Sequence, residues 1–119
     1  MIRFVVPGPP VSKARPRVVR GHTYTPEKTR RFERLVGMCA RTAGARPIAG
    51  EVSVSISFYL PTKRRVDLDN LSKGVLDGLN KIAWADDSQV STLFATRQLD
   101  RANPRAVIEI QEVGDGPVS

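Results

Sequence analysis

The strongest constraint on the fold is residues 51–60, EVSVSISFYL, where apolar and polar side chains alternate along the whole stretch. The apolar positions are Val52, Val54, Ile56, Phe58 and Leu60, and most of the positions between them are serines. Successive side chains of a β-strand point to opposite faces, so this pattern predicts a strand with one buried face and one polar face. Other elements of the chain must cover the apolar face.

Two helices are predicted, one before and one after this strand. Thr25-Pro26 is a helix start, with a hydroxyl side chain as the cap and proline at the first helical position. Apolar residues then recur at helical spacing up to Gly44, the expected stop; they are Phe32, Leu35, Val36, Cys39 and Ala43. The second helix is predicted over residues 69–81 from an apolar stripe formed by Leu71, Val75, Leu79 and Ile82.

The remaining segments predict a small sheet. Residues 2–6, IRFVV, form a short strand, and a basic, proline-bearing loop follows over residues 7–24. Residues 90–99 and 106–113 read as two strands, and the short connection DRANPR between them suggests a hairpin. The element order β-α-β-α-β-β predicts an α+β fold, with a mixed sheet packed with two helices.

The length and hydrophobicity of the chain indicate one folded domain. A chain of 119 residues with 40% hydrophobic residues can bury a real core, so disorder is excluded as the overall class. We expect the domain to cover residues 1–113 and residues 114–119 to form a flexible tail.

The charge of the chain points to a polyanionic partner. The net charge is +7 and the sequence pI is about 10.3. Residues 1–50 hold 11 Lys and Arg against 2 Asp and Glu, whereas residues 51–119 hold 8 against 10. A solubilising basic surface is the alternative interpretation, and it explains the net charge better than this asymmetry.

Several site classes are excluded by residue counts. Cys39 is the only cysteine and His22 the only histidine, so neither an intrachain disulfide nor a Cys/His zinc cluster can form. We interpret Cys39 as a small core residue and His22 as a solvated loop residue. The start MIRFVVPGPP resembles neither a signal peptide nor a membrane span, so the cytoplasm is the expected compartment and no membrane partner is expected.

Acidic residues gather at both ends of the second predicted helix. Asp67 and Asp69 precede it within RRVDLDNLSK, and the pair Asp86-Asp87 follows it. In an extended segment, residues two apart point the same way, so both carboxylates of the first pair could face one point. Helix capping would explain one of these aspartates but not two, nor the second pair.

The two acidic pairs meet only if the chain folds back. A helix of about 13 residues is about 20 Å long, so its ends are too far apart for one site. A strand that starts at Val90 and pairs near residues 51–60 could bring them together. Three converging carboxylates need a cation between them, and with oxygen ligands alone Mg²⁺ or Mn²⁺ is the natural ion. Lys73 could pair with Asp69 or neutralise charge on a phosphate oxygen.

Two basic clusters are candidate DNA contacts. The first alternates along a loop and the second immediately precedes the acids; they are Lys13, Arg15 and Arg17, and Lys63, Arg64 and Arg65. For any single member, a solvated surface charge is an equal alternative. The first helix has a basic outer face, with Arg30, Arg31 and Arg34 as weaker candidates. Trp84, Phe94 and Tyr24 are interpreted as packing residues, because aromatic residues are only 6% of the chain.

Residues 66–90, VDLDNLSKGVLDGLNKIAWADDSQV, resemble the signature region of the RusA family of Holliday junction resolvases, which occur in bacteria, phages and prophages. The N-terminal segment PGPPVSKARPRVVRGHTYTPEKTRRFE is also similar to that family. The resemblance implies a homodimeric, Mg²⁺-dependent endonuclease that nicks two opposing strands of a four-way DNA junction. It assigns catalytic roles to Asp67, Asp69, Lys73 and Asp87, with the three aspartates as metal ligands and Asp86 as a weaker candidate.

Two other functions fit the same residues. One is a non-catalytic module that binds DNA junctions, although a pure binder gains nothing from acids placed near phosphates. The other is an RNA-directed metal nuclease, which composition does not exclude. A dimer follows from symmetry: a junction has two-fold symmetry, and paired cuts by a chain with one acidic cluster require a second chain. The cellular role, whether in recombination, repair or phage DNA processing, is left open by the residues.

Overall fold

The computed structural model describes residues 1–13, 17–24 and 26–114. Residues 115–119, most of the expected tail, lie outside the described residues. The described elements follow in chain order: β1 (Ile2–Pro7), β2 (Arg17–Val19), β3 (His22–Tyr24), α1 (Glu27–Thr42), β4 (Val52–Leu60), α2 (Leu68–Leu79), the short 3₁₀ turn η1 (Asp87–Gln89), β5 (Val90–Leu99) and β6 (Arg105–Glu112).

The main sheet is mixed, and its strand order is β1-β6-β4-β5. Strand β4 runs parallel to β5 and antiparallel to β6, and β1 pairs antiparallel with β6. The predicted α+β class with a mixed sheet is therefore confirmed, as is the pairing of β5 beside β4. Parallel neighbours need a crossover connection, and α2 with the turn after it provides that connection here.

The predicted hairpin between the last two strands is wrong. Strands β5 and β6 do not pair with each other, because β4 lies between them. The crossover through α2 fixes β5 on one edge of β4, so the other edge is left for β6. The connection after β5 is held at the end of β4, where the amide of Asp100 donates to the carbonyl of Leu60 at 2.8 Å. An Asp100–Arg105 ion pair of 2.9 Å closes the connection.

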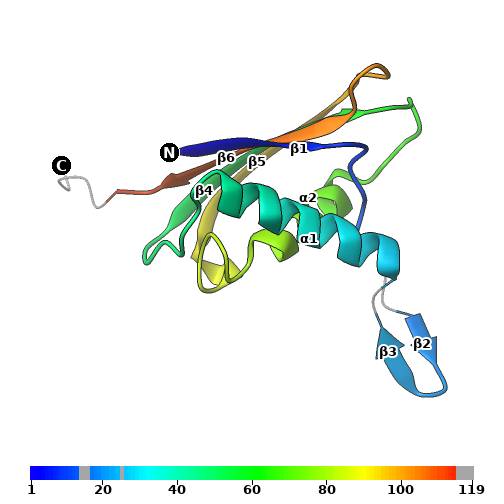
Figure 1. Ribbon diagram of the computed structural model, residues 1–119, viewed down its shortest axis with the longest axis horizontal. Coiled ribbons are helices and arrows are strands. Elements are labelled where there is room, and N and C mark those ends of the chain that lie inside the picture. Colours follow the sequence, from blue (N-terminus) through cyan, green and yellow to red (C-terminus); the bar gives the residue numbers. More distant parts are fainter. Residues whose placement is uncertain (14–16, 25, 115–119) are drawn as a thin grey trace.

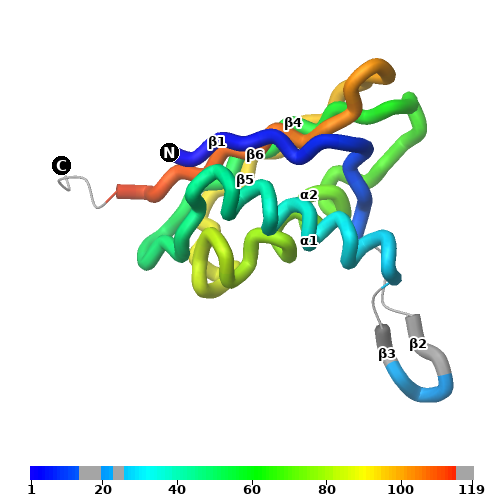
Figure 2. The backbone as a smooth tube through the Cα atoms, in the orientation of Figure 1, coloured from blue at the N-terminus to red at the C-terminus, as the bar shows by residue number. Residues whose placement is uncertain are grey.

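Both helices lie on the same side of the sheet (Figures 1 and 2). The alternation that predicted β4 is fully realised, because its five apolar side chains are buried and face the helices. Phe32 and Val36 of α1 and Leu71 and Val75 of α2 complete the core. The two helices approach closely at Gly78, where an added methyl group would lie 2.7 Å from the carbonyl oxygen of Glu33.

The start of α1 differs from the prediction. The helix begins at Glu27, and Pro26 is its N-cap residue rather than its first helical residue, with ψ at 144° and no side-chain cap. Thr25, the predicted cap, lies outside the described residues. The end agrees with the prediction, because Gly44 has a φ of +94° just after the C-cap residue Ala43. Ala43 is exposed, whereas Cys39 packs partly buried against the core.

The basic loop contains an element that the sequence pattern did not predict. Strands β2 and β3 pair antiparallel and form a hairpin that stands away from the sheet and helices in Figure 1. Arg20 and Gly21 both have positive φ, 51° and 79°, the conformation of the favoured two-residue hairpin turn. Strands of three residues are too short to show alternation. His22 belongs to β3 and is exposed, as expected of a solvated residue.

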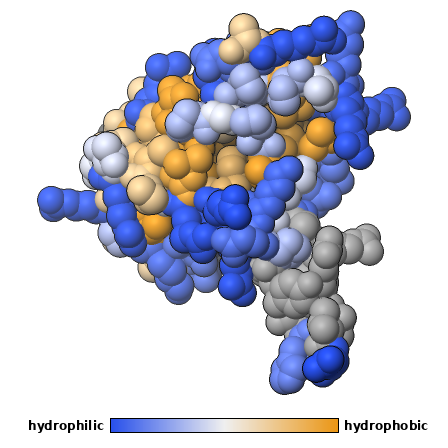
Figure 3. Space-filling view, turned by 45° about the vertical axis from the view of Figure 1, so that its right-hand side comes forward, coloured by the Kyte–Doolittle hydropathy of each residue, from blue (hydrophilic) through white to orange (hydrophobic). Residues whose placement is uncertain are grey.

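Among the described residues, exposed apolar side chains gather mainly in two places. One is the groove between β1 and α1, lined by Val5, Leu35, Met38 and Cys39, and Figure 3 shows apolar surface gathered among hydrophilic side chains. The other is the edge strand β5, where Phe94 is 64% exposed. Phe94 is therefore not the packing residue predicted, whereas Trp84 is fully buried as predicted. Among the described residues, no helix is both long and apolar enough to cross a membrane.

Candidate active site

The first acidic pair lies at the start of α2. Asp67 is the N-cap residue, and its Oδ1 accepts a hydrogen bond of 2.9 Å from the amide of Asp69. The capping interpretation is therefore correct for Asp67. Both carboxylates are exposed, and the positive end of the helix favours negative charge at this place. The cap uses one oxygen of Asp67 and leaves the carboxylate of Asp69 facing solvent.

The start of α2 is held by contacts from distant parts of the chain. The amide of Lys13 donates to the carbonyl of Asn70 at 2.9 Å, and the guanidinium of Arg97 on β5 donates to the carbonyl of Val66. These bonds fix the N-terminal loop and the connector after β4 on either side of the helix start. Asp67 therefore projects from a braced position rather than from a free loop.

Lys13, a predicted DNA contact, bridges the two helices. Its ammonium group lies 2.6 Å from a Glu33 carboxylate oxygen on α1 and 3.0 Å from one of Asp77 on α2. Burial opposes the charged form of Lys13, but the hydrogen bonds to Glu33 and Asp77 outweigh it, so its pKa is raised above the ordinary value. Asp77 therefore has a structural role, as one of the two carboxylates that hold Lys13.

The second acidic pair lies in a turn fixed by Gln89. The Gln89 side chain accepts hydrogen bonds from the amides of Ala85 and Asp86, at 2.9 and 3.0 Å. It also donates to the carbonyls of Ile48 and Gly50, at 2.6 and 2.8 Å. The Gln89 side chain therefore closes the acidic turn and also holds it against the segment before β4.

Asp86 and Asp87 have different partners. Asp86 caps η1 and accepts hydrogen bonds from the hydroxyl and amide of Ser88, which lower its pKa. Asp87 accepts a 2.8 Å hydrogen bond at Oδ1 from the indole N–H of Trp84, which is fully buried. The indole orients the Asp87 carboxylate and leaves Oδ2 without a hydrogen bond from a described residue. This geometry favours Asp87 over Asp86 as a ligand or catalytic group.

The three candidate metal ligands are not gathered into one site. Within residues 1–13, 17–24 and 26–114, no group of three or more His, Cys, Asp and Glu side chains is placed to hold a metal ion. The strand at Val90 does pair with β4, but it runs parallel to it, with Val90 opposite Val52. The acidic turn therefore lies at the start of β4, whereas Asp67 and Asp69 follow its end, and the two pairs stay apart. The donor chemistry suits a hard divalent cation, whereas the present spacing does not. Lys73 is exposed and forms no ion pair with Asp69.

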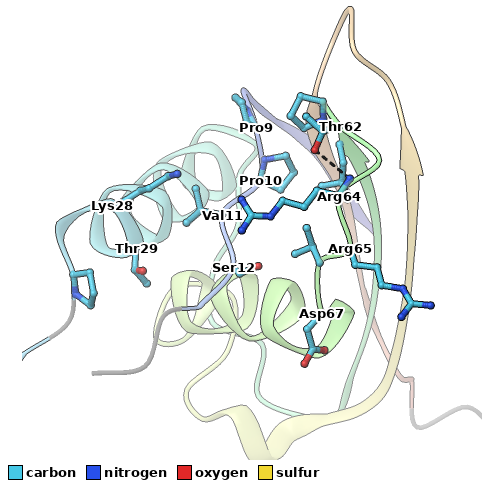
Figure 4. A pocket seen from close by; sticks show the side chains of 14 residues that line it. Pro9, Pro10, Val11, Ser12, Lys28, Thr29, Thr62, Arg64, Arg65 and Asp67 are labelled. Atoms are coloured by element: carbon cyan, nitrogen blue, oxygen red, sulfur yellow. Dashed lines mark hydrogen bonds between the residues drawn. The ribbon is translucent and has the colours of Figure 1, made fainter. Parts of the chain in front are cut away.

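A cavity of about 670 Å³ opens beside Asp67 (Figure 4). Three segments line it: the loop at residues 9–12, the start of α1, and the connector at residues 60–67. In Figure 4, Arg64 reaches across the cavity toward Val11, whereas Arg65 points away from it. The cationic side chains at its rim thus lie next to a carboxylate of the acidic pair.

The other predicted DNA contacts lie in separate places. Lys63 is exposed and lines a smaller depression together with Arg97. Arg17 belongs to β2, and its side chain is not described; Arg15 lies outside the described residues. The structure therefore places Arg64 and Arg65 in the connector that lines the cavity beside Asp67, and it keeps Lys13 in two ion pairs. The contacts of these residues with DNA stay predictions.

Comparison with known proteins identifies the class and then the family. The family model of Endodeoxyribonuclease RusA matches residues 7–111. Crossover junction endodeoxyribonuclease RusA of Escherichia coli K12 is 30% identical, over 94% of this chain and 95% of its own length. The uncharacterized protein YqaN of Bacillus subtilis is 32% identical, over 94% and 96%. The RusA protein of Enterobacteria phage 82 is 35% identical over 57% and 58%.

The α+β domain described above is therefore a nuclease domain. The chain belongs to the RusA family of endodeoxyribonucleases, as the resemblance of residues 66–90 predicted.

The sequence did not predict the hydrogen bonds by which two residues, Gln89 and Trp84, support the acidic turn. Gln89 has a readable signal, because an acidic cap followed three positions later by Gln is a capping box, and the stretch DDSQ contains one. The indole bond from Trp84 has no such signal. It depends on how the buried ring is turned, which only the packed structure determines.

Proposed function

We propose that the protein is a Holliday junction resolvase, which binds four-way DNA junctions as a homodimer and nicks two opposing strands symmetrically. The observation that carries this proposal is the family match over residues 7–111, together with relatives named crossover junction endodeoxyribonuclease. The basic rim beside an exposed pair of carboxylates supports it, because cations bind the DNA backbone while acids serve the chemistry.

In this proposal Asp67, Asp69 and Asp87 hold a divalent cation, Mg²⁺ or Mn²⁺, and Lys73 neutralises charge on the scissile phosphate. A divalent cation bound there would polarise the phosphodiester and lower the pKa of a bound water. Asp67 and Asp69 already share one helix start, and Asp87 has one oxygen oriented by Trp84. Asp87 lies past the other end of α2, just before β5, so within one chain it does not reach the first pair.

We propose the homodimer from the two-fold symmetry of a DNA junction and from the exposed apolar surfaces of the chain. A two-fold symmetric junction that is cut twice needs two related sites, and each chain carries one set of the candidate residues Asp67, Asp69 and Asp87. The groove between β1 and α1 and the exposed edge of β5 are the apolar surfaces available to a second copy. We also propose that the enzyme acts in the cytoplasm, in recombination, repair or phage DNA processing.

The test is a cleavage assay with defined substrates. The purified protein is given a synthetic four-way junction, a linear duplex of the same arm sequence and a single strand, each with Mg²⁺ and with EDTA. We expect paired nicks in the junction alone, lost with EDTA. A protein that binds the junction tightly but cuts nothing in Mg²⁺ or Mn²⁺ would instead be a binding module. Cleavage of RNA in preference to junction DNA would support the third function.

Asp69→Asn is the matched variant for this assay. It should slow cleavage by at least about a hundredfold, because it removes a proposed metal ligand. Junction binding should stay equal or become tighter, because a charge that repels phosphate is lost. Glu112→Gln on β6 removes one exposed carboxylate outside the site and should cut at the normal rate. Normal cleavage by Asp69→Asn would show that the site is elsewhere.

A further inference from the structure

We propose that the cavity beside Asp67 receives one unpaired deoxynucleotide of the bound junction, with its base inside and its phosphates at the rim. This inference rests on the proposed function and adds a base-binding subsite to it. The cavity volume of about 670 Å³ lies within the range of about 300–1,000 Å³ that is usual for pockets that bury small ligands. It therefore suits a single nucleotide and is too small for a duplex.

The walls of the cavity suit a flat, weakly polar base. Pro9, Pro10, Leu60 and Pro61 provide apolar surfaces on two sides. Hydroxyl groups stand among them, from Ser12, Thr29 and Thr62. Hydroxyls can donate or accept hydrogen bonds at a base edge, whereas a site for a phosphate alone has no use for the apolar surface. Thr29 is buried among these walls, so its hydroxyl is screened from bulk solvent.

The charged side chains of the cavity lie at its rim, whereas its walls are apolar or carry hydroxyl groups. Lys28 and Arg64 are exposed and carry the cationic groups of the rim, and Figure 4 places the Arg64 guanidinium across the opening. A guanidinium binds phosphate bidentately, and its plane can also stack on a base. Asp67 stands at the same rim. A nucleotide whose base enters the cavity would therefore hold its phosphate next to the acidic pair.

The cavity is built from braced segments. The loop at residues 9–12 is anchored at its end by the bond from the Lys13 amide to the Asn70 carbonyl and by the Lys13 ion pairs. The carbonyl of Val11 would lie 3.1 Å from a methyl group added at Gly74, so the loop packs directly on α2. A preformed pocket of this kind favours extrusion of a base, because binding does not have to order the pocket. The free-energy cost of ordering protein segments is then not added to the cost of unpairing the base.

The test uses the fluorescent base 2-aminopurine, placed at each of the two positions on either side of the nick in a four-way junction. The wild-type protein is added in EDTA, so that binding is observed without cleavage. We expect a several-fold rise of fluorescence at one position, because an extruded base loses its stacked neighbours. The fluorescence should stay high while the base lies in the pocket, because none of the described lining residues is aromatic and could stack on the base.

Val11→Phe fills the cavity, and Val113→Phe, at an exposed position after β6, is its matched control. The first variant should abolish the fluorescence rise while the junction Kd changes less than about threefold, and the control should keep the rise. Thr29→Val removes one wall hydroxyl with little change of shape and should reduce the rise, which covers the case in which Val11→Phe folds poorly.

The outcomes separate this inference from the proposed function. Junction binding and paired nicking with no fluorescence rise at any position would overturn the base subsite alone. A rise that survives in both Val11→Phe and Thr29→Val would overturn it as well. Failure to bind or cut junctions at all would overturn the proposed function, and the subsite with it.

Discussion

At the residue scale, the hydrogen bond from Trp84 to Asp87 can be removed while the buried aromatic ring is kept, so its effect on cleavage can be measured apart from its effect on packing. We expect Trp84→Phe to keep the buried ring and lose the indole N–H, so that Asp87 is no longer oriented. By analogy with residues that orient metal ligands, the Mg²⁺ concentration for half-maximal cleavage should rise about 10–100-fold. The measurement is the cleavage rate as a function of Mg²⁺ concentration.

Tyr59→Phe is the control for this variant, because it removes a hydroxyl from the opposite face of the sheet while the stacking of Arg105 on the ring remains. A Trp84→Phe enzyme with unchanged Mg²⁺ dependence would mean that the indole only fills space. Trp84 is also the only tryptophan of the chain, so its fluorescence in the wild type gives a second readout of metal binding.

The ion pairs of Lys13 predict a stability effect that depends on pH. Lys13→Met leaves the carboxylates of Glu33 and Asp77 without their cation and should lower the free energy of unfolding by about 1.5–3 kcal/mol near neutral pH. Urea denaturation measures this, with Lys63→Met as the exposed control. Because the pKa of folded Lys13 is raised, its stabilisation is complete below the unfolded-state pKa and is lost as the pH rises through the folded-state value.

A difference between Lys13→Met and the wild type that grew with rising pH would contradict this assignment. If the variant were as stable as the wild type but bound junctions less tightly, Lys13 would be a DNA contact, as the sequence pattern first predicted.

The residues of the site were only partly predictable from the sequence. The paired aspartates at 67 and 69 were found because spacing along one segment determines their direction. The role of Lys13 was not predicted, because its partners Glu33 and Asp77 are 20 and 64 residues away along the chain. They meet Lys13 only when the helices pack. Local patterns report local geometry, and ion pairs across the fold depend on packing.

At the scale of elements, the packing of α1 on α2 sets the position of Asp67. Gly78→Ala should destabilise the protein by about 1–3 kcal/mol, because the added methyl group would lie 2.7 Å from the Glu33 carbonyl and 2.9 Å from Cβ of Val36. Both contacts are with atoms that cannot move without moving α1. Thermal or urea denaturation measures the loss, which should exceed the gain in helix propensity from alanine.

Gly50→Ala is the matched control, because nothing lies within 4 Å of a methyl group there and its φ is not in the positive range. It should change stability by less than about 0.5 kcal/mol. A stable Gly78→Ala protein with full activity would show that the helices can separate without disturbing the site.

The elements were predicted better than their arrangement. Every strand of the main sheet and both helices were found, because each repeats its pattern over several residues. The position of β6 between β1 and β4 was not predicted, because periodicity along one strand does not say which strands are its neighbours. The short connection after β5 suggested a hairpin, yet the crossover through α2 had already determined which edge of β4 was free.

At the scale of the whole molecule, the uneven charge of the chain becomes a spatial arrangement. The basic first half supplies α1 and the loop beside the cavity, whereas the second half supplies the acids of α2 and the turn. The two halves meet at the cavity, where Lys28 and Asp67 line the same space. A cation from the basic first half therefore lies in the same cavity as an acid from the second half.

A dimer with one site per chain predicts the behaviour of mixed dimers. Wild-type and Asp69→Asn subunits are refolded together with different tags and the mixed species is purified. On a supercoiled plasmid with an extruded cruciform, it should produce nicked circles, whereas wild type produces linear product, because only one site can cut. Linear product from the mixed species at the wild-type rate would mean that one site makes both cuts.

The central position of β6 has a consequence for the biosynthesis of the enzyme. Strand β1 pairs with β6 alone among the described strands, and of these strands β6 is the last to be synthesised. A nascent chain that lacks it cannot join the first strand to the rest of the sheet, so Phe4 and Val6 have no partner strand to cover them. A chain cut off before β6 would therefore leave β1 unpaired and be a substrate for degradation.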